Sequence, residues 1–181
     1  MILVVAATEL ELAGADGAEQ LVCGIGPVEA AAVTARALAE RRPDALLHVG
    51  IAGATGIEPP ALVIGSEALY CDITGDLAAQ IPRVERVEPA PRLVEAARAA
   101  LPEALVLPIG TTAHVGRGVG CDVEAMEGFG VLRAAALADV PALELRAISN
   151  AVGETDRAHW RFADAFAALA DGTRRVLAAL E

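Results

Sequence analysis

Two kinds of hydrophobic pattern alternate along this chain. Residues 1–7 are almost all aliphatic and are followed at once by polar residues, which is typical of a strand buried on both faces. Residues 27–41 instead repeat apolar side chains at helical spacing, begin with a proline and end next to Arg42 and Pro43, which are helix start and stop signals. The same criteria predict strands over 1–7, 20–23, 45–51, 61–70, 104–109 and 143–149, and helices over 27–41, 91–101, 129–137 and 162–180.

This alternation of strands and helices predicts an α/β protein. Residues 20–53 form a strand, a glycine turn, a helix and a strand, which is the βαβ unit of parallel sheets. We therefore expect a three-layer αβα sandwich with a mostly parallel or mixed central sheet, formed by residues 1–181 as one domain. Residues 72–91 carry little periodicity and several prolines, so we expect a lid or a rim of the functional site there.

The chain is strongly acidic. Its net charge is −11, its 14 basic residues are all arginine, and 55% of its residues are hydrophobic although only 3% are aromatic. The core is therefore expected to be aliphatic, and binding to nucleic acid or to an anionic membrane is disfavoured. No apolar run reaches the roughly 18 residues of a membrane span, and no positive segment precedes the first apolar run. We expect a cytoplasmic protein with a small ligand.

The glycine pair Gly24 and Gly26 lies between a strand and a helix, as in dinucleotide-binding folds. Glu29 stands where that fingerprint has its third glycine, and its carboxylate would face the pyrophosphate. A tight turn that opens the helix and lets backbone amides approach some other ligand is the better interpretation.

Histidines and cysteines give no sign of a metal site. Their spacing matches no zinc motif, and no nucleotide-triphosphate or serine-hydrolase motif is present, so we expect neither a metal nor an organic cofactor. His48 lies within an apolar strand, which indicates a hydrogen-bonded core residue, whereas His114 follows a strand and could reach a ligand. Cys23, Cys71 and Cys121 are most simply buried thiols.

Polar residues at predicted strand ends carry more information. Glu11 follows the first strand, Glu127 begins a helix, and Asn150 ends the strand over 143–149. Ligands of open α/β sheets bind at the carboxyl ends of the strands, so these three side chains are expected to converge on one site.

Six segments carry the most specific signal. They are residues 6–11 (AATELE), 24–30 (GIGPVEA), 48–54 (HVGIAGA), 66–70 (SEALY), 123–128 (VEAMEG) and 146–160 (RAISNAVGETDRAHW). In this order they resemble the nucleoside phosphorylase and nucleosidase superfamily. Within it they are most similar to the futalosine hydrolases, because the nucleosidases have aspartate where this chain has Asn150.

The resemblance implies a hydrolase that cleaves the N-glycosidic bond of futalosine and releases hypoxanthine, a step of an alternative menaquinone pathway. It implies that Glu11 activates the attacking water, Glu127 holds the ribose hydroxyls, Met126 packs against the sugar and Asn150 binds the purine edge. The chemistry is consistent, because carboxylates stabilise an oxocarbenium-like sugar and a carboxylate is a suitable base for water. An asparagine NH₂ can also donate to the O6 and N7 acceptors of a 6-oxopurine, which an ionised aspartate would repel.

The resemblance also places Ile51, Ala52 and Gly53 against the substrate. Phosphorylases of this superfamily hold phosphate with arginines and a serine near the glycine loops. Here Ile51 occupies the centre of its loop, and no arginine lies between Met1 and Gly26, so a buried phosphate dianion would be uncompensated. Water is therefore expected to be the nucleophile.

Futalosine carries a carboxylated aryl ketone on its 5′ side, which requires an apolar slot with a cation at its mouth. Arg157 or Arg117 could supply that cation. For Arg157, a surface ion pair with Asp156 or Glu154 is the simpler interpretation.

The remaining candidates near the C-terminus have structural alternatives. Trp160 either forms a wall of the pocket or covers the core, and we favour core packing for Phe162 and Phe166 at helical spacing. Glu144 and Arg146 share one face of a strand and are expected to pair structurally.

Other functions remain open at this point. An adenine-specific methylthioadenosine/S-adenosylhomocysteine or aminofutalosine nucleosidase would differ in the released base, and a purine nucleoside phosphorylase would require phosphate. A dinucleotide-binding oxidoreductase and a noncatalytic nucleoside-binding module are less consistent with Glu11 and Glu127. The expected partners are a small nucleoside and, by resemblance, a second copy of the chain in a homodimer or larger homo-oligomer.

Overall fold

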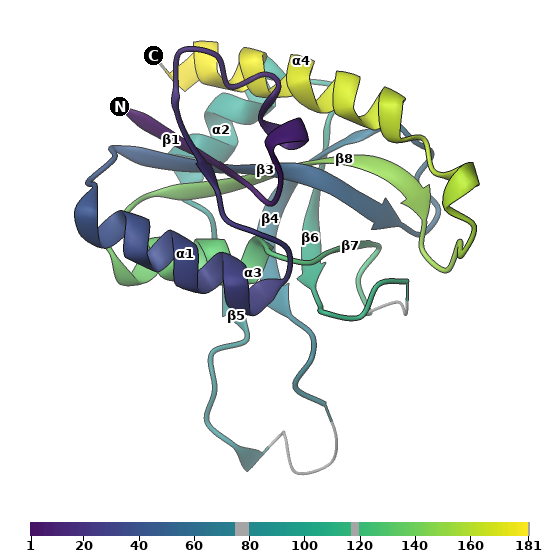
Figure 1. Cartoon of the computed structure of the whole chain (residues 1–181), viewed down its shortest axis with the longest axis horizontal. Coiled ribbons are helices and arrows are strands. Elements are labelled where there is room, and N and C mark those ends of the chain that lie inside the picture. Colours follow the sequence, from purple (N-terminus) through teal and green to yellow (C-terminus); the bar gives the residue numbers. More distant parts are fainter. Residues whose placement is uncertain (75–79, 117–119, 181) are drawn as a thin grey trace.

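The computed structural model describes residues 1–74, 80–116 and 120–180. Within them, α1 (Pro27–Glu40) and α3 (Gly128–Leu137) cover one face of a central sheet, and α2 (Pro91–Ala100) and α4 (Phe162–Leu180) cover the other (Figure 1). The expected three-layer arrangement is confirmed. The strands are β1 (Ile2–Ala6), β2 (Glu19–Val22), β3 (Ala45–Ala54), β4 (Leu62–Tyr70), β5 (Arg86–Val87), β6 (Leu105–Thr111), β7 (Val123–Ala125) and β8 (Ala142–Ala151).

The sheet is mixed and curls back on itself. Its order is β2-β1-β3-β7-β6-β4-β5, and β8 pairs with both β3 and β4. The pairs β3–β7, β4–β5 and β4–β8 are antiparallel, whereas β1 lies parallel to both β2 and β3. Because β3 pairs with β8 along its length and with β7 only at Gly53 and Ala54, the ends of β3, β7 and β8 meet at one edge.

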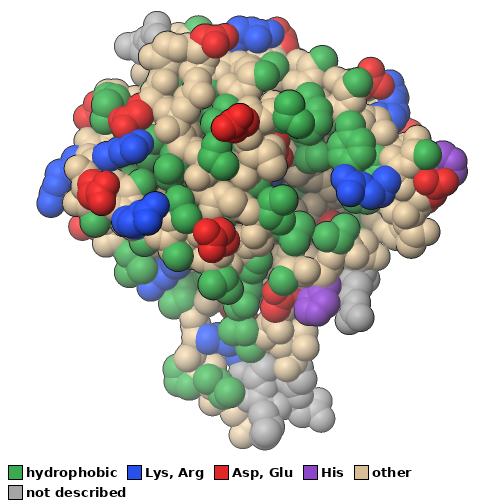
Figure 2. All heavy atoms as spheres, viewed as in Figure 1, with side chains coloured by type: hydrophobic (Ala, Val, Ile, Leu, Met, Phe, Trp, Pro, Cys, Tyr) green, Lys and Arg blue, Asp and Glu red, His purple; other side chains and the backbone are tan. Residues whose placement is uncertain are grey.

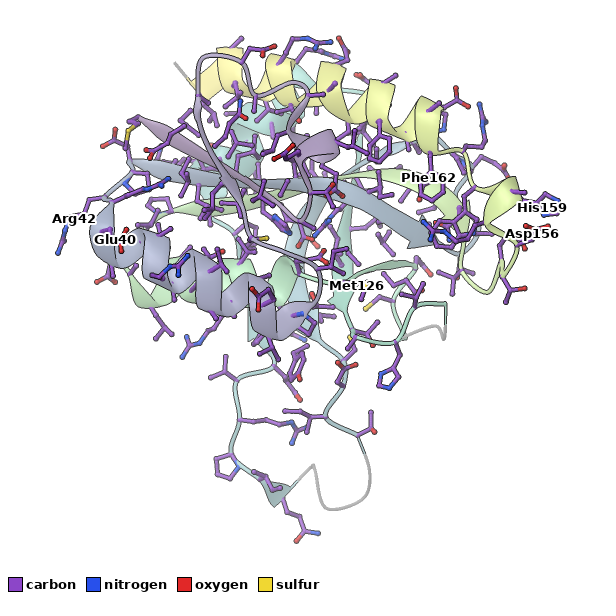
Figure 3. All side chains as sticks on the ribbon, viewed as in Figure 1. Glu40, Arg42, Met126, Asp156, His159 and Phe162 are labelled. Carbon is purple, nitrogen blue, oxygen red and sulfur yellow. The ribbon has the colours of Figure 1, made fainter. Side chains whose placement is uncertain are left out.

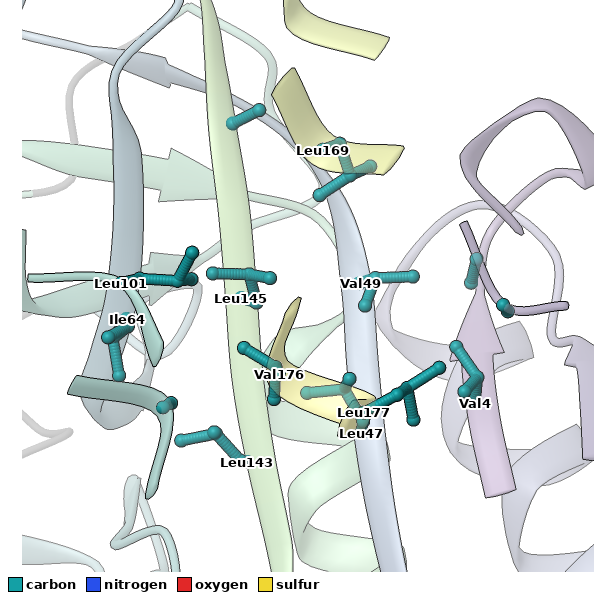
Figure 4. Packing of buried hydrophobic residues seen from close by; sticks show 14 of the residues in the cluster. Val4, Leu47, Val49, Ile64, Leu101, Leu143, Leu145, Leu169, Val176 and Leu177 are labelled. Atoms are coloured by element: carbon teal, nitrogen blue, oxygen red, sulfur yellow. The ribbon is translucent and has the colours of Figure 1, made fainter. Parts of the chain in front are cut away.

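Two aliphatic layers sandwich the sheet, as the composition predicts. Val4 of β1 packs with Leu145, Leu169 and Val176 beneath α2 and α4 (Figure 4). Leu3, which precedes Val4 in β1, belongs to the second layer, under α1 and α3. Burial of successive residues on opposite faces explains the continuous apolar run at the start of the chain.

All ten predicted helices and strands are present, with shifted ends. β3 extends three residues beyond the predicted end. The small residues 52–54 are part of the strand because they pair with β8, and Gly53 and Ala54 also pair with β7. The sequence analysis missed β5 and β7, which have two and three residues and are too short to show a period. It also missed the short turns η1 (Glu9–Leu12) and η3 (Arg157–His159).

The segment after β4 differs from the expected lid. Residues 80–91 and the described part of 72–79 run out from the body and return through β5 (Figure 1). Asp72 is anchored at its base, since its carboxylate accepts hydrogen bonds from Thr112 Oγ1 at 2.5 Å and from the backbone N of Ala113 at 3.0 Å. Residues 75–79 lie outside the described residues.

No helix in the described part of the chain combines the length and hydropathy that crossing a bilayer requires.

Candidate functional site

A cavity of about 750 Å³ opens at the edge where the strand ends meet. The ends of β3, β7 and β8 form its inner wall, η1 borders it on one side, and the start of α4 borders it on another. Met126, directly after β7, and Phe162, the first residue of α4, both line it and lie near the carboxyl end of β3 (Figure 3). Its size and its place in the sheet are those of a small-molecule site.

The cavity brings together most of the residues predicted from the sequence. They come from segments more than 100 residues apart, and only folding makes them neighbours. Those that line the cavity are Glu11, Ile51, Ala52, Gly53, Met126, Glu127, Asn150, Arg157 and Trp160.

His114 is the predicted residue that does not line the cavity. Its ring is more than half exposed and lies 3.6 Å, from Nδ1 to Oδ1, from the carboxylate of Asp72. Its backbone N donates to Thr112 Oγ1, so the turn faces the base of the projecting segment. None of the described residues of 72–91 lines the cavity, which corrects the lid expectation as well. Arg117, the other predicted cation, lies outside the described residues.

Three hydrogen bonds hold the carboxylate of Glu11. Thr8 donates to Oε2 from its backbone N and from its Oγ1, both at 3.0 Å, and the backbone N of Ile51 donates to Oε1 at 3.1 Å. The Thr8 and Glu11 side chains form the capping box of η1, so a local helix-start motif fixes this residue. Glu11 is only 6% exposed, and its donors define where its oxygens lie.

Glu127 is held by the glycine turn and by Arg146. The backbone N of Gly26 donates to its Oε1 at 3.0 Å, and its Oε2 lies 3.6 Å from Nη2 of Arg146. Gly26 has a φ of 96°, which glycine adopts without strain. The expected tight turn is present, but the amide of Gly26 binds the Glu127 carboxylate and not a ligand.

A buried cluster of charged and polar groups lies beneath both glutamates. Arg146 donates from Nε to Glu144 Oε1 at 2.8 Å, and its Nη2 lies 2.5 Å from His48 Nε2. His48 Nδ1 lies 2.9 Å from the carbonyl oxygen of Val5, so Nδ1 carries the proton and Nε2 accepts from Arg146. The expected Glu144–Arg146 pair and the expected core role of His48 are confirmed.

The surroundings of this cluster shift three pKa values. Burial, reinforced by the charge of Arg146, holds the pKa of His48 well below its usual range, so the ring is neutral. Burial raises the pKa of Glu144, and Arg146 opposes that shift. Burial next to Glu127 raises the pKa of Cys23 to about 12, which leaves an unreactive thiol. Cys71 and Cys121 are only partly buried, unlike the expectation for all three cysteines.

Asn150 has a fixed amide orientation at the end of β8. Its Oδ1 accepts from Ser149 Oγ at 2.7 Å, and its Nδ2 donates one proton to the carbonyl of Ala151 at 3.0 Å. The second Nδ2 proton remains to donate to a ligand in the cavity that Asn150 lines.

Aromatic side chains line the outer part of the cavity. Phe162 and Phe166 stack with ring centroids 6.2 Å apart and both line the cavity, so the expectation of core packing for them is corrected. The guanidinium of Arg157 lies 5.6 Å from the Trp160 ring centroid and 5.3 Å from that of Phe162. Trp160 is tied down by a hydrogen bond from its Nε1 to the carbonyl of Glu154 at 3.1 Å.

Arg157 makes no ion pair with a described carboxylate, contrary to the simpler interpretation. Glu154 instead pairs with His159, and Asp156 accepts from the backbone N of Ala158. Asp156 and His159 lie at the outer edge of the molecule, away from the cavity (Figure 3). Arg157 is thus a cation at an aromatic-lined opening.

Sequence reasoning missed several residues that line the cavity. Thr8, Ser149 and Glu124 are polar, and each lies within one of the six segments that carry the resemblance but was not singled out as a site residue. A capping-box pattern from Thr8 to Glu11 was present in the sequence and could have identified the first. Glu124 lies within the segment 123–128 that carries part of the resemblance, but β7, which places it in the cavity, was not predicted.

Comparison with known proteins shows the family of this chain. Residues 20–180 match the Phosphorylase superfamily. A futalosine hydrolase from Streptomyces coelicolor is 38% identical over an alignment of 190 residues. The alignment covers 92% of this chain and 81% of that protein.

This chain belongs to the futalosine hydrolase family. The resemblance drawn from the six sequence segments is thereby confirmed. Solved structures with low sequence identity to this chain share its fold. A 5′-methylthioadenosine/S-adenosylhomocysteine nucleosidase from Colwellia psychrerythraea, in complex with adenine, matches 99% of this chain and 93% of its own with a TM-score of 0.84 at 21% identity. A futalosine hydrolase mutant from Helicobacter pylori matches 99% and 97% with a TM-score of 0.84 at 17% identity.

In this futalosine hydrolase family member, the neutral His48 predicts a specific loss of stability in acid. The native state keeps the ring unprotonated, whereas the unfolded chain takes up a proton below a pH of about 6.5. His48 therefore contributes stability that is present above that pH and falls by up to about 1.4 kcal/mol per pH unit below it. The measurement is urea unfolding of the wild type and of His48→Gln between pH 5 and pH 8. The difference between their unfolding free energies should change below pH 6.5 and stay level above it; a constant difference would contradict a neutral buried ring.

Proposed function

We propose that this chain hydrolyses the N-glycosidic bond of futalosine and releases hypoxanthine. The observation that carries the proposal is the pair of buried carboxylates, Glu11 and Glu127, in one cavity with the amide of Asn150. The relative from Streptomyces coelicolor, a futalosine hydrolase, supports the same substrate.

In the reaction, the bond between the sugar C1′ and the purine nitrogen breaks, and a water oxygen bonds to C1′. Glu11 takes the proton of that water, since a buried carboxylate held by three donors is positioned to act as a base. The base leaves with the electron pair of the broken bond. As the bond breaks, positive charge develops on the ribose ring, and the carboxylates that line the cavity stabilise it.

Glu127 and Met126 hold the sugar. Two ribose hydroxyls can donate to the Glu127 carboxylate, whose position is set by Gly26 and Arg146. Met126 supplies an adaptable apolar contact against the ring.

Water is favoured over phosphate as the nucleophile by the distribution of charge. Arg157 is the one basic side chain among the described residues that line the cavity, and it lies at the aromatic opening. Arg146 is buried beneath the cavity and is already engaged with Glu144 and Glu127. A phosphate dianion beside Ile51 would lie close to the Glu11 carboxylate, which binds the backbone of Ile51.

The outer part of the cavity suits the 5′ substituent. Trp160, Phe162 and Phe166 form an apolar slot for an aryl ketone, and Arg157 supplies a positive charge for its carboxylate. Stacking on two rings holds the guanidinium in place at this opening.

A substrate panel tests the proposed function. The purified chain is incubated with futalosine, aminofutalosine, inosine and methylthioadenosine, each with and without phosphate, and the released base is identified. We expect hypoxanthine from futalosine at a rate that phosphate does not change. Glu11→Gln should lower kcat by about 10²- to 10⁴-fold, because the amide cannot accept the water proton. Turnover that requires phosphate, or release of adenine alone, would contradict the proposal.

Asn150 predicts the base preference of the enzyme. An aspartate at this position repels O6 and N7 when ionised and, when protonated, pairs with the donor and acceptor of an aminopurine. Asn150→Asp should therefore shift the ratio of kcat/KM for futalosine over aminofutalosine toward the aminopurine by about 10-fold or more. Asn150→Ala, which removes the amide without adding a charge, is the matched control. An unchanged ratio in Asn150→Asp would show that Asn150 does not select the base.

We also propose that the chain assembles into a homo-oligomer. The projecting segment carries exposed Ile81 and Val84, and hydrophobic side chains are visible on it in Figure 2. An apolar projection of this kind suits contact with a second copy of the chain. Light scattering should give at least twice the 18.5 kDa of one chain, and Ile81→Ser with Val84→Ser should lower that mass; a monomeric wild type would rule the assembly out.

A further inference from the structure

Arg146 lies between two buried glutamates and is bound more closely by the one that does not line the cavity. Its Nε donates to Glu144 Oε1 at 2.8 Å, whereas its Nη2 lies 3.6 Å from Glu127 Oε2. The first distance is that of a charge-assisted hydrogen bond, and the second is too long for a hydrogen bond. Of the two glutamates, only Glu127 lines the cavity.

Glu144 is a buried carboxylate that the mechanism above does not use. Its side chain is fully buried, and its Oε2 has no hydrogen-bond partner among the described residues. Replacing a buried ion pair by apolar side chains of similar volume is often neutral or stabilising, so stability alone is a weak reason for a carboxylate at this place. A buried group with an unpartnered oxygen instead indicates a task in the site.

The neighbours of the Arg146 guanidinium fix which of its edges faces Glu144. Nη2 lies 2.5 Å from His48 Nε2, and Nη1 donates to the carbonyl oxygen of Ile51 at 3.4 Å. A Cβ at Gly128 would overlap the Glu144 carboxylate, so this glycine makes room for it. The Nε edge therefore meets Glu144, and the Nη groups point to His48 and to residues that line the cavity.

This geometry leaves one oxygen of Glu127 without a protein hydrogen bond. Oε1 accepts from the backbone N of Gly26 at 3.0 Å, whereas Oε2 has no donor within hydrogen-bond distance among the described residues. The guanidinium therefore places a positive charge beside the carboxylate without occupying its acceptor positions. Two ribose hydroxyls require those positions.

We propose that Glu144 is a positioning residue that holds the Arg146 guanidinium back from Glu127 and so keeps the Glu127 carboxylate open to the ribose hydroxyls. The proposal rests on the function proposed above, in which Glu127 holds the sugar.

Removal of Glu144 changes the partner of the guanidinium. Arg146 then turns to Glu127, its other ion-pair partner, because a buried cation without a close counter-charge is unfavourable. A direct hydrogen bond from the guanidinium occupies the acceptor positions of Glu127. The 2′-hydroxyl of a ribose then finds no free acceptor, and the preference for ribose over 2′-deoxyribose is lost.

Binding of a ribonucleoside and of its 2′-deoxy form tests this role. The ligands are a carbon-linked analogue of inosine, whose bond to the base cannot be hydrolysed, its 2′-deoxy form, and hypoxanthine. Each is titrated by calorimetry into the wild type, Glu144→Met and Glu144→Gln. The matched control is Glu40→Gln, at the exposed end of α1 that Figure 3 shows far from Met126. The wild type and this control should bind the ribonucleoside about 10- to 100-fold more tightly than its 2′-deoxy form, which is the effect of one hydrogen bond to a charged group.

The two Glu144 variants should lower this ratio to different extents. Glu144→Met offers no acceptor to Nε, so the ratio should fall to within about 3-fold, while the affinity for hypoxanthine stays within about 3-fold of the wild type. Glu144→Gln keeps the shape and a neutral acceptor, so its ratio should lie between those of the wild type and Glu144→Met.

The ratio distinguishes positioning from a purely structural role. If Glu144 only stabilises the fold, its variants should unfold at lower urea concentration and keep the ratio of the wild type, which would overturn the proposal. Equal affinity of the wild type for the two nucleosides, or no binding of either, would overturn it too. Should Glu144→Met not fold, an unchanged ratio in Glu144→Gln would overturn it. Failure of the proposed function appears separately, as a lack of futalosine turnover by the wild type.

Discussion

The buried guanidinium of Arg146 is the interaction on which the site depends. It bonds to Glu144 and to neutral His48, and it lies against Glu127 beneath the cavity floor. Removing one partner from a buried charged pair costs about 3–5 kcal/mol, because the other charge is left uncompensated. Two glycines make room for it: a Cβ at Gly50 would lie 2.0 Å from Arg146 Nη1, and one at Gly128 would lie 2.2 Å from Glu144 Oε2.

This cluster sets the electrostatics of the cavity from below. Arg146 offsets Glu144 and lies near Glu127, while Glu11 is held by the backbone of Ile51 and by Thr8. The wall around the ribose therefore carries more negative than positive charge, and the positive charge of Arg157 lies at the aromatic opening. That distribution matches a sugar that becomes cationic and a 5′ substituent that ends in a carboxylate.

Much of this arrangement could be predicted from the sequence. Strand and helix periods located β1, β3, β8 and α4, and the rule that ligands bind at carboxyl strand ends brought Glu11, Glu127 and Asn150 to one site. The predictions that failed depend on tertiary contacts. Helical spacing alone could not show that Phe162 and Phe166 face a cavity, because an apolar stripe is the same whether it meets a core or a ligand.

His114 and Glu124 show the same limit at the level of single residues. The strand-end position of His114 was correctly located, but its ring turns to Asp72, which lies 42 residues earlier in the chain. Glu124 gained its place beside Gly53 through β7, a three-residue strand whose pairing is not encoded in any local pattern. Contacts between segments that are distant in the sequence, rather than local sequence, decided both outcomes.

The central claim is that buried carboxylates make the cavity complementary to a cationic ribose. The most direct test compares the dissociation constants of two nonhydrolysable nucleoside analogues with the same oxopurine base, one with a protonated imino-sugar ring and one with an uncharged ring. The account predicts that the cationic analogue binds at least about 10²-fold more tightly, as expected for a site that favours the transition state. Equal affinity for the two analogues would contradict it.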